Sequence, residues 1–137
     1  EVPLSQSYAV TGSVNQLGDV QPVGGINEKV EGYFRICADR GLTGRQGVLI
    51  SRANLSNLML RDEVVQAVAA GQFQIHAISH VDEAIAQLTG LPAGQRSANG
   101  EFEAGSINAN IEVRLINFAD ARVGQIGLLA DREATDG

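Results

Sequence analysis

The stretch Gly24-Gly25-Ile26-Asn27-Glu28-Lys29-Val30 joins a pair of glycines to the start of a predicted helix. Apolar residues recur at helical spacing from Ile26 to Arg40, with charged residues on the opposite side. The apolar stripe comprises Ile26, Val30, Tyr33, Phe34 and Cys37. Gly41 follows as the expected end of the helix. Because the two glycines lack side chains, another segment can approach the start of this helix closely.

Lys29 is the only lysine in the chain, and nine arginines carry the other positive side chains. A guanidinium stays charged in proteins, whereas an ammonium in a suitable environment can lose its proton and act as a base. Lys29 lies about 60° from Ile26 around the helix axis, so we expect it to be half buried at the edge of the apolar stripe. Burial and the positive end of the helix dipole both favour the uncharged amine. Lys29 is therefore a candidate base, and the alternative is an ordinary surface lysine.

Two strands are predicted before this helix, at residues 7–14 and 19–23, joined by the turn Asn15-Gln16-Leu17-Gly18. We expect them to pair as a β-hairpin that leads into the two glycines. A short apolar strand follows the helix at residues 47–50. The order strand, helix, strand predicts a parallel crossover.

The rest of the chain alternates short elements with loops of small residues. Ser79 is the expected N-cap of a helix that Gly90 ends. In the helix predicted at residues 62–70, Val64, Val65 and Val68 are expected to face inward. The predicted elements are a helical turn at 54–59, helices at 62–70, 81–88 and 106–121, a strand at 73–78 and a frayed tail at 130–137. The sequence thus predicts an α+β domain in which a β-hairpin is followed by strand/helix crossover units.

The composition excludes several classes of function. A net charge of −6 and a pI near 4.8 leave no basic patch to neutralise phosphates, so we expect no direct nucleic-acid binding. No apolar run approaches the roughly 18 residues of a membrane span, so we expect no membrane partner. The single cysteine, Cys37, rules out an internal disulfide and fits a reducing compartment. Its place on the apolar stripe indicates core packing in preference to a reactive thiol.

Motifs for cofactors and metals are not matched. Neither G-x-G-x-x-G nor G-x-x-x-x-G-K-[ST] occurs, so no residue of this segment is assigned to a nucleotide or another cofactor. His76 and His80 span the end of a predicted strand and the start of a helix, so helical metal-ligand spacing does not apply to them. We therefore expect no metal site.

Two runs of the sequence closely resemble the proteolytic domain of Lon ATP-dependent proteases. They are Ala9-Val10-Thr11-Gly12-Ser13-Val14 and Gly18-Asp19-Val20-Gln21-Pro22-Val23-Gly24-Gly25-Ile26-Asn27-Glu28-Lys29. Further matches in the same order are Gly47-Val48-Leu49-Ile50, Asn54, Asn57-Leu58 and Asp82-Glu83-Ala84. Asn15-Gln16 and Gly41-Leu42-Thr43-Gly44 resemble the bacterial Lon-like proteins that carry a divergent ATPase region.

This resemblance implies a Lon-type proteolytic domain and a serine endopeptidase that uses a Ser-Lys dyad. Lys29 falls at the position of the family's catalytic lysine, and Thr11 matches a family threonine whose hydroxyl could hold the lysine nitrogen. The resemblance further implies that the full-length protein is cytoplasmic and assembles into a homo-oligomeric ring, a hexamer. It would use ATP and Mg²⁺, bound elsewhere in its chain, to thread unfolded or damaged polypeptide substrates.

The family's nucleophilic serine precedes the lysine by more than the 28 residues available before Lys29. Ser5, Ser7 and Ser13 do not lie in the nucleophile motif. We therefore expect residues 1–90 to be the C-terminal part of the proteolytic domain, inactive alone, with a linker or loop at 91–105 and a helix and tail at 106–137. The competing hypothesis is a non-catalytic Lon-like module used for assembly or binding.

Overall fold

The computed structural model describes residues 2–135, with side-chain surroundings given through Val123. The chain divides into two units, Glu1–Leu91 and Pro92–Gly137, which are described separately below. The first unit contains all the named strands of the described residues and three of their α-helices.

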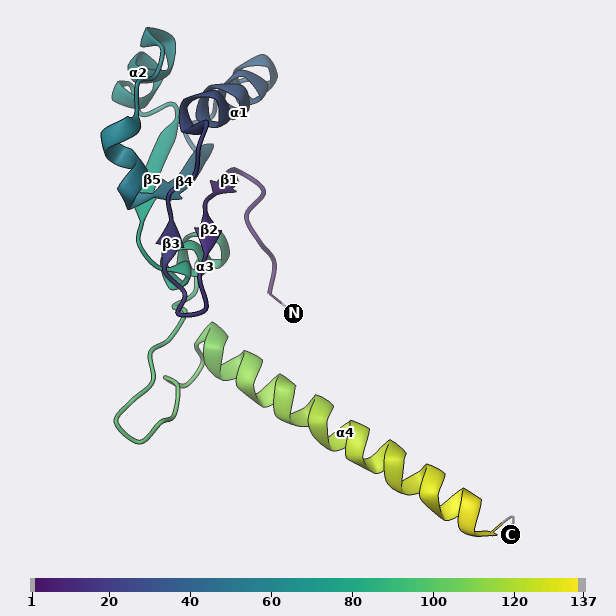
Figure 1. The fold of residues 1–137 in the computed structure, drawn as a ribbon. Coiled ribbons are helices and arrows are strands. Elements are labelled where there is room, and N and C mark those ends of the chain that lie inside the picture. The colour runs from purple at the N-terminus through teal and green to yellow at the C-terminus, as the bar shows by residue number, and fades with distance from the viewer. Residues whose placement is uncertain (1, 136–137) are drawn as a thin grey trace. The chain divides into compact units, whose positions relative to one another are not determined.

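A three-stranded parallel sheet forms the centre of the first unit (Figure 1). Its strands are β1 (Tyr8–Thr11), β4 (Gly47–Ser51) and β5 (Gln74–Ile78), in the order β1-β4-β5. Helix α1 (Ile26–Arg40) connects β1 to β4, so the predicted parallel crossover is confirmed, as are both predicted ends of this helix. Every residue of β4 is buried, as expected for a central parallel strand that is covered on both faces.

Helices cover both faces of the sheet. Val48 and Ile50 of β4 pack on one face against α1 and α2 (Asp62–Ala69). Leu49, which points the opposite way, packs with Ala84 of α3 (Val81–Thr89). The first unit is therefore a layered α+β fold, as the sequence predicts. Between β4 and α2 lies a short 3₁₀ helix, η1 (Arg52–Asn57).

The first predicted strand is wrong in its extent, because residues 7–14 divide between two sheets. β1 pairs in parallel with β4, whereas β2 (Ser13–Val14) pairs antiparallel with β3 (Val20–Gln21). Gly12 separates the two strands, and a methyl group there would lie only 2.8 Å from the Val20 side chain. The absent side chain lets β3 approach closely, so the chain leaves one sheet and enters the hairpin at this glycine.

Helix α2 faces the core with a different set of residues from the one predicted. Val64 is fully buried and Ala67 is 7% exposed, but Val65 is 52% exposed. The expected inward position of Val65 is wrong because it lies about 100° from Val64 around the helix. The residues one turn apart, Val64, Ala67 and Val68, share the face that packs on the core.

The second unit begins with a loop and continues as one long helix. In the loop, Arg96 forms an isolated bridge with Phe102, covers its ring at 4.1 Å, and pairs with Glu112 at 2.8 Å. Helix α4 runs over Ile107–Thr135, so the predicted helix end near Ala121 and the predicted tail from Ala130 are wrong over these residues. No proline follows Ala121 to force an end. Residues 136 and 137 of the predicted tail lie outside the described residues.

Within residues 2–135, no helix combines the length and the apolar content that a membrane crossing requires.

Candidate functional site

A pocket of about 550 Å³ lies at the start of α1. The segment between β3 and α1 forms one side of it, and two asparagines of η1 complete the lining. The lining residues are Pro22, Val23, Gly24, Gly25, Ile26, Asn27, Glu28, Asn54 and Asn57. The glycine pair that the sequence singles out therefore borders an open space.

The N-terminus of α1 has no side-chain cap. Its N-cap residue, Gly25, adopts a left-handed conformation with φ 66° and ψ 32°, which a residue with a side chain reaches only at a cost. The Lys29 backbone N–H donates to the Gly25 carbonyl at 3.1 Å and forms the first helical turn. The N-terminus of α1 therefore borders the pocket without a side-chain hydrogen bond that caps its first turn.

Lys29 is exposed, so its expected half-buried position is wrong. The buried residues of α1 are Ile26, Val30, Phe34 and Cys37. Their stripe centres on the side of Ile26 away from Lys29, which places Lys29 about 95° from the centre. Among the described residues, the Lys29 ammonium has no hydrogen-bond or ion-pair partner. Lys29 directly follows Glu28, which lines the pocket.

Thr11 is half buried at the carboxyl end of β1, where it is paired with Ile50 of β4. It precedes Gly12, and a methyl group at Gly12 would lie 3.5 Å from the Gln21 carbonyl oxygen. Gln21 is followed by Pro22, the first residue of the pocket lining. In the described part of the chain, no hydrogen bond joins these two predicted site residues, Thr11 and Lys29.

Asn54 is a residue of this site for which the sequence predicts no role. It is only 3% exposed, and its side chain forms two hydrogen bonds with the backbone of Val23. Its Nδ2 donates to the Val23 carbonyl at 3.0 Å, and its Oδ1 accepts from the Val23 N–H at 3.0 Å. An asparagine inside a helical turn can signal such a role, but the partner is 31 residues away in the sequence and cannot be deduced from spacing.

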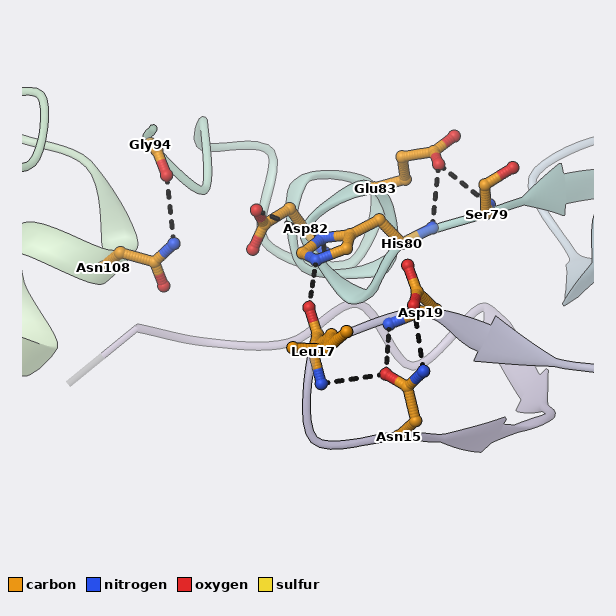
Figure 2. Close-up of polar contacts among 9 residues, drawn as sticks. All are labelled: Asn15, Leu17, Asp19, Ser79, His80, Asp82, Glu83, Gly94 and Asn108. Carbon is orange, nitrogen blue, oxygen red and sulfur yellow. Dashed lines mark hydrogen bonds and ion pairs between the residues drawn. The ribbon is translucent and has the colours of Figure 1, made fainter. Parts of the chain in front are cut away.

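The tip of the hairpin is attached to the start of α3 (Figure 2). The His80 Nε2–H donates to the Leu17 carbonyl at 3.0 Å, and its Nδ1 accepts from the Asp82 N–H at 3.2 Å. Glu83 Oε1 accepts from the backbone N–H groups of Ser79, at 2.8 Å, and His80, at 3.0 Å. The predicted N-cap Ser79 is therefore wrong by one residue. Glu83, three residues after His80, completes the capping box.

The network around Glu83 changes its ionisation. The hydrogen bond from the Ser79 backbone N–H is the largest cause that holds the pKa of Glu83 below its usual 4.5, and the His80 N–H and Arg52 act in the same direction. Arg52 also donates to Ser79 Oγ and to the Ala77 carbonyl, both at 2.9 Å. Short polar links thus hold η1, β5 and α3 together at this end of the sheet.

A second, smaller pocket of about 230 Å³ lies beside the middle of α1. Cys37 borders it but is only 6% exposed, which confirms the predicted core position of the thiol. The Tyr33 hydroxyl donates to the Ser7 carbonyl at 3.0 Å. Burial raises the pKa of Tyr33 above its usual 10, and the Cys37 thiol adds to the shift. These groups tie α1 to the segment before β1.

The two histidines have separate surroundings. His76 lies on β5, where its Nε2 is 2.9 Å from Gln74 Oε1 and its ring packs edge-on against Tyr8. His80 caps α3. Among the residues whose side chains the structure describes, no three His, Cys, Asp or Glu side chains are arranged to hold a metal ion.

Comparison with known proteins relates the chain to Lon proteases. It is 53% identical over 91 residues to a Lon protease homolog of Escherichia coli strain K12, covering 66% of this chain and 16% of that protein. It is 38% identical over 121 residues to a Lon protease homolog of Haemophilus influenzae, covering 88% of this chain and 20% of that protein. An archaeal Lon protease of Halobacterium salinarum is 32% identical over 93 residues, which cover 67% of this chain and 12% of that protein.

No sequence profile of a known protein family matches the chain. The chain spans about a fifth or less of the length of these relatives. The likeness is nevertheless shared by bacterial and archaeal relatives, and the helices and strands agree with the α+β fold expected from the resemblance. The chain belongs to the Lon protease family.

Proposed function

We propose that this chain is part of the proteolytic domain of a Lon-like serine endopeptidase, with Lys29 as the general base. The observation that supports the proposal is the position of the only lysine, at the start of α1 and next to a pocket of about 550 Å³. The nucleophile would be a serine outside these 137 residues.

The proposed reaction needs the uncharged amine of Lys29. The serine hydroxyl attacks a peptide carbonyl while the Lys29 Nζ takes its proton, and the protonated lysine then gives that proton to the leaving amine. Water, activated in the same way, hydrolyses the acyl-enzyme and releases the second product. Lys29 is exposed in this chain. Since exclusion from water favours the uncharged amine, the segment that carries the serine would have to cover Lys29.

Thr11 is proposed to assist as a holding group for the Lys29 nitrogen. Its hydroxyl can accept a hydrogen bond from the ammonium and donate one to the amine. The two residues share no hydrogen bond within the described residues. In this proposal they therefore come together only when the rest of the active site is assembled.

We extend the proposal to the full-length protein by analogy with its relatives. It would be cytoplasmic, form a homo-oligomeric ring and cleave unfolded or damaged polypeptides. ATP and Mg²⁺ would supply energy in a separate part of that protein. The 137 residues contain no phosphate-binding motif, so ATP takes part in none of the reaction steps proposed for them.

The first test is substitution of Lys29 in the full-length protein. Lys29→Ala and Lys29→Arg are both expected to lower kcat for casein or a fluorogenic peptide by about 10²–10⁴-fold, because a guanidinium keeps the charge but cannot accept a proton. Arg35→Ala, an exposed change on the same helix, serves as the matched control and should leave cleavage unchanged. Assembly is checked by size-exclusion chromatography. Retained cleavage by Lys29→Ala would remove Lys29 from the mechanism.

The exposure of Lys29 and its lack of a partner among the described residues favour a second candidate, a non-catalytic Lon-like module used for assembly or binding. The two candidates differ in the unmodified full-length protein. A peptidase cleaves casein and is labelled on a serine by a fluorophosphonate, whereas a module does neither while it still assembles. In either case the isolated chain is expected to cleave nothing.

A further inference from the structure

Two asparagine side chains link the turn before α1 to η1 and the residues that follow it. Asn54 of η1 reaches to Val23, just before the glycine pair, and forms the two hydrogen bonds described above. Asn27, in the first turn of α1, reaches back to the end of η1. Its Nδ2 donates to the Asn57 carbonyl at 3.1 Å, and its Oδ1 accepts from the Met59 N–H at 2.8 Å. Each amide uses both a donor and an acceptor, so the pair forms a reciprocal clamp.

The clamp encloses the most deformable part of the site. Gly24 has no atom within 4 Å of the position that a side chain would take, and Gly25 is in the left-handed region. Glycines restrict the backbone least, and an uncapped first helical turn frays readily. With no side-chain cap on α1, the links made by Asn54 and Asn27 are the side-chain hydrogen bonds that fix this turn among the described residues.

We propose that Asn54 and Asn27 are positioning residues for Lys29, an inference that rests on the proposed function. Val23 is fixed before the glycines, and Asn27 is fixed two residues before Lys29, so the clamp sets the direction in which α1 starts. Lys29 is exposed, and among the described residues its side chain has no hydrogen-bond or ion-pair partner. Its position is therefore set by the backbone of α1, where its N–H donates to the Gly25 carbonyl. A small displacement of the backbone in this turn therefore moves the Lys29 amine relative to the serine. Misplacement of a reacting group by about 1 Å can cost up to about 10²-fold in rate.

The Asn54 position also allows a substitution of nearly equal shape. In Asn54→Asp, the carboxylate still accepts from the Val23 N–H but can no longer donate to the Val23 carbonyl. It places a negative oxygen against that carbonyl at a site that is 3% exposed. Asn27→Ala removes the other half of the clamp at a partly exposed position. It provides a variant that folds even if Asn54→Asp does not.

The experiment measures cleavage and backbone protection in the full-length protein. For Asn54→Asp and Asn27→Ala we expect kcat to fall about tenfold or more with KM changed by less than about twofold, measured well below the unfolding temperature. Hydrogen exchange in peptides covering residues 24–34 should accelerate about tenfold. Asn99→Ala, in the exposed loop of the second unit, is the control and should change neither quantity.

The outcomes separate this inference from the proposed function. If Lys29→Ala abolishes cleavage but both clamp variants keep the wild-type kcat, the clamp does not position the base and only this inference is overturned. A merely structural role would lower the unfolding temperature without changing kcat per folded molecule, and that result also overturns it. If Lys29→Ala still cleaves, the proposed function fails and this inference fails with it.

Discussion

The N-termini of α1 and α3 solve the same problem in opposite ways. At α3, a histidine and a glutamate from the helix itself satisfy the first backbone N–H groups, and the same histidine binds the hairpin tip. At α1, a left-handed glycine replaces the cap, and two asparagines hold the turn through links to a different element. The N-terminus of α1, next to the pocket, is therefore held by hydrogen bonds to η1 and the residues after it, and has no side-chain cap. The N-terminus of α3 is instead capped by neighbouring residues of its own chain segment.

The largest loss of stability is expected from Gly18→Ala, which disturbs the contact between the hairpin tip and the capped N-terminus of α3. Gly18 has φ +90°, and a methyl group there would lie 2.3 Å from His80 Nε2. Left-handed strain and displacement of the His80 ring together should lower the free energy of unfolding by about 2–4 kcal/mol. Urea denaturation of the chain measures this loss.

Gly24→Ala is the matched control for that change. A methyl group at Gly24 meets no atom within 4 Å, and its φ is not in the left-handed region. We expect its free energy of unfolding to change by less than about 0.5 kcal/mol. Equal losses for the two variants would mean that the contact between the hairpin tip and His80 does not matter for stability.

A smaller effect is expected at the N-terminus of α1, from Gly25→Ser. At an ordinary N-cap, serine in place of glycine gains a few tenths of a kcal/mol. Gly25 has φ 66°, so left-handed strain should cost a serine there about 1–2 kcal/mol. A capping serine normally has an extended backbone, so from the Gly25 conformation its hydroxyl is not directed at the first N–H groups of the helix. We therefore expect a net loss of about 1 kcal/mol, measured by urea denaturation.

Gly25→Ala distinguishes the reason for that loss. If serine cannot cap from this conformation, serine and alanine should be equally destabilising within about 0.3 kcal/mol. A serine variant that is more stable than the alanine variant by about 1 kcal/mol would indicate a working cap. The N-terminus of α1 would then lack a cap only because residue 25 is a glycine, and not because its backbone conformation prevents capping.

The sequence predicted those features that depend on neighbouring residues. The periodicity of α1 and its end at Gly41 were sufficient to place the helix from Ile26 to Arg40. The cap of α3 was displaced by one residue because Ser79 is a usual N-cap and Asp82 stands three residues after it. The actual cap is His80, whose side chain is an unusual choice.

Features that join distant residues could not be predicted in this way. The Asn54 link to Val23 and the Asn27 link to Met59 depend on how η1 lies beside α1, which no local spacing encodes. The exposure of Lys29 was missed for a related reason. Its angle from Ile26 was known, but the centre of the buried stripe depends on the elements that pack against α1.

The smallest effect is expected from Glu83→Gln, which tests whether the negative charge of Glu83 stabilises the capped N-terminus of α3. Glu83→Gln keeps an oxygen that can accept from the Ser79 and His80 N–H groups but removes the negative charge. Because Glu83 is partly exposed, with 45% of its side chain accessible, we expect a loss of only about 0.5–1 kcal/mol near neutral pH.

The pH dependence of that loss gives the decisive measurement, because the pKa of Glu83 in the folded protein lies below its usual 4.5, chiefly through the Ser79 N–H bond. A carboxyl with a lowered pKa in the folded state contributes its full stabilisation above the unfolded value, and the contribution disappears as the pH falls through the lower folded value. The difference in unfolding free energy between wild type and Glu83→Gln should therefore be constant above about pH 6 and shrink below 4.5. Urea denaturation at a series of pH values measures it. A difference that does not change with pH would mean that hydrogen-bond geometry alone, without charge, closes this end of α3.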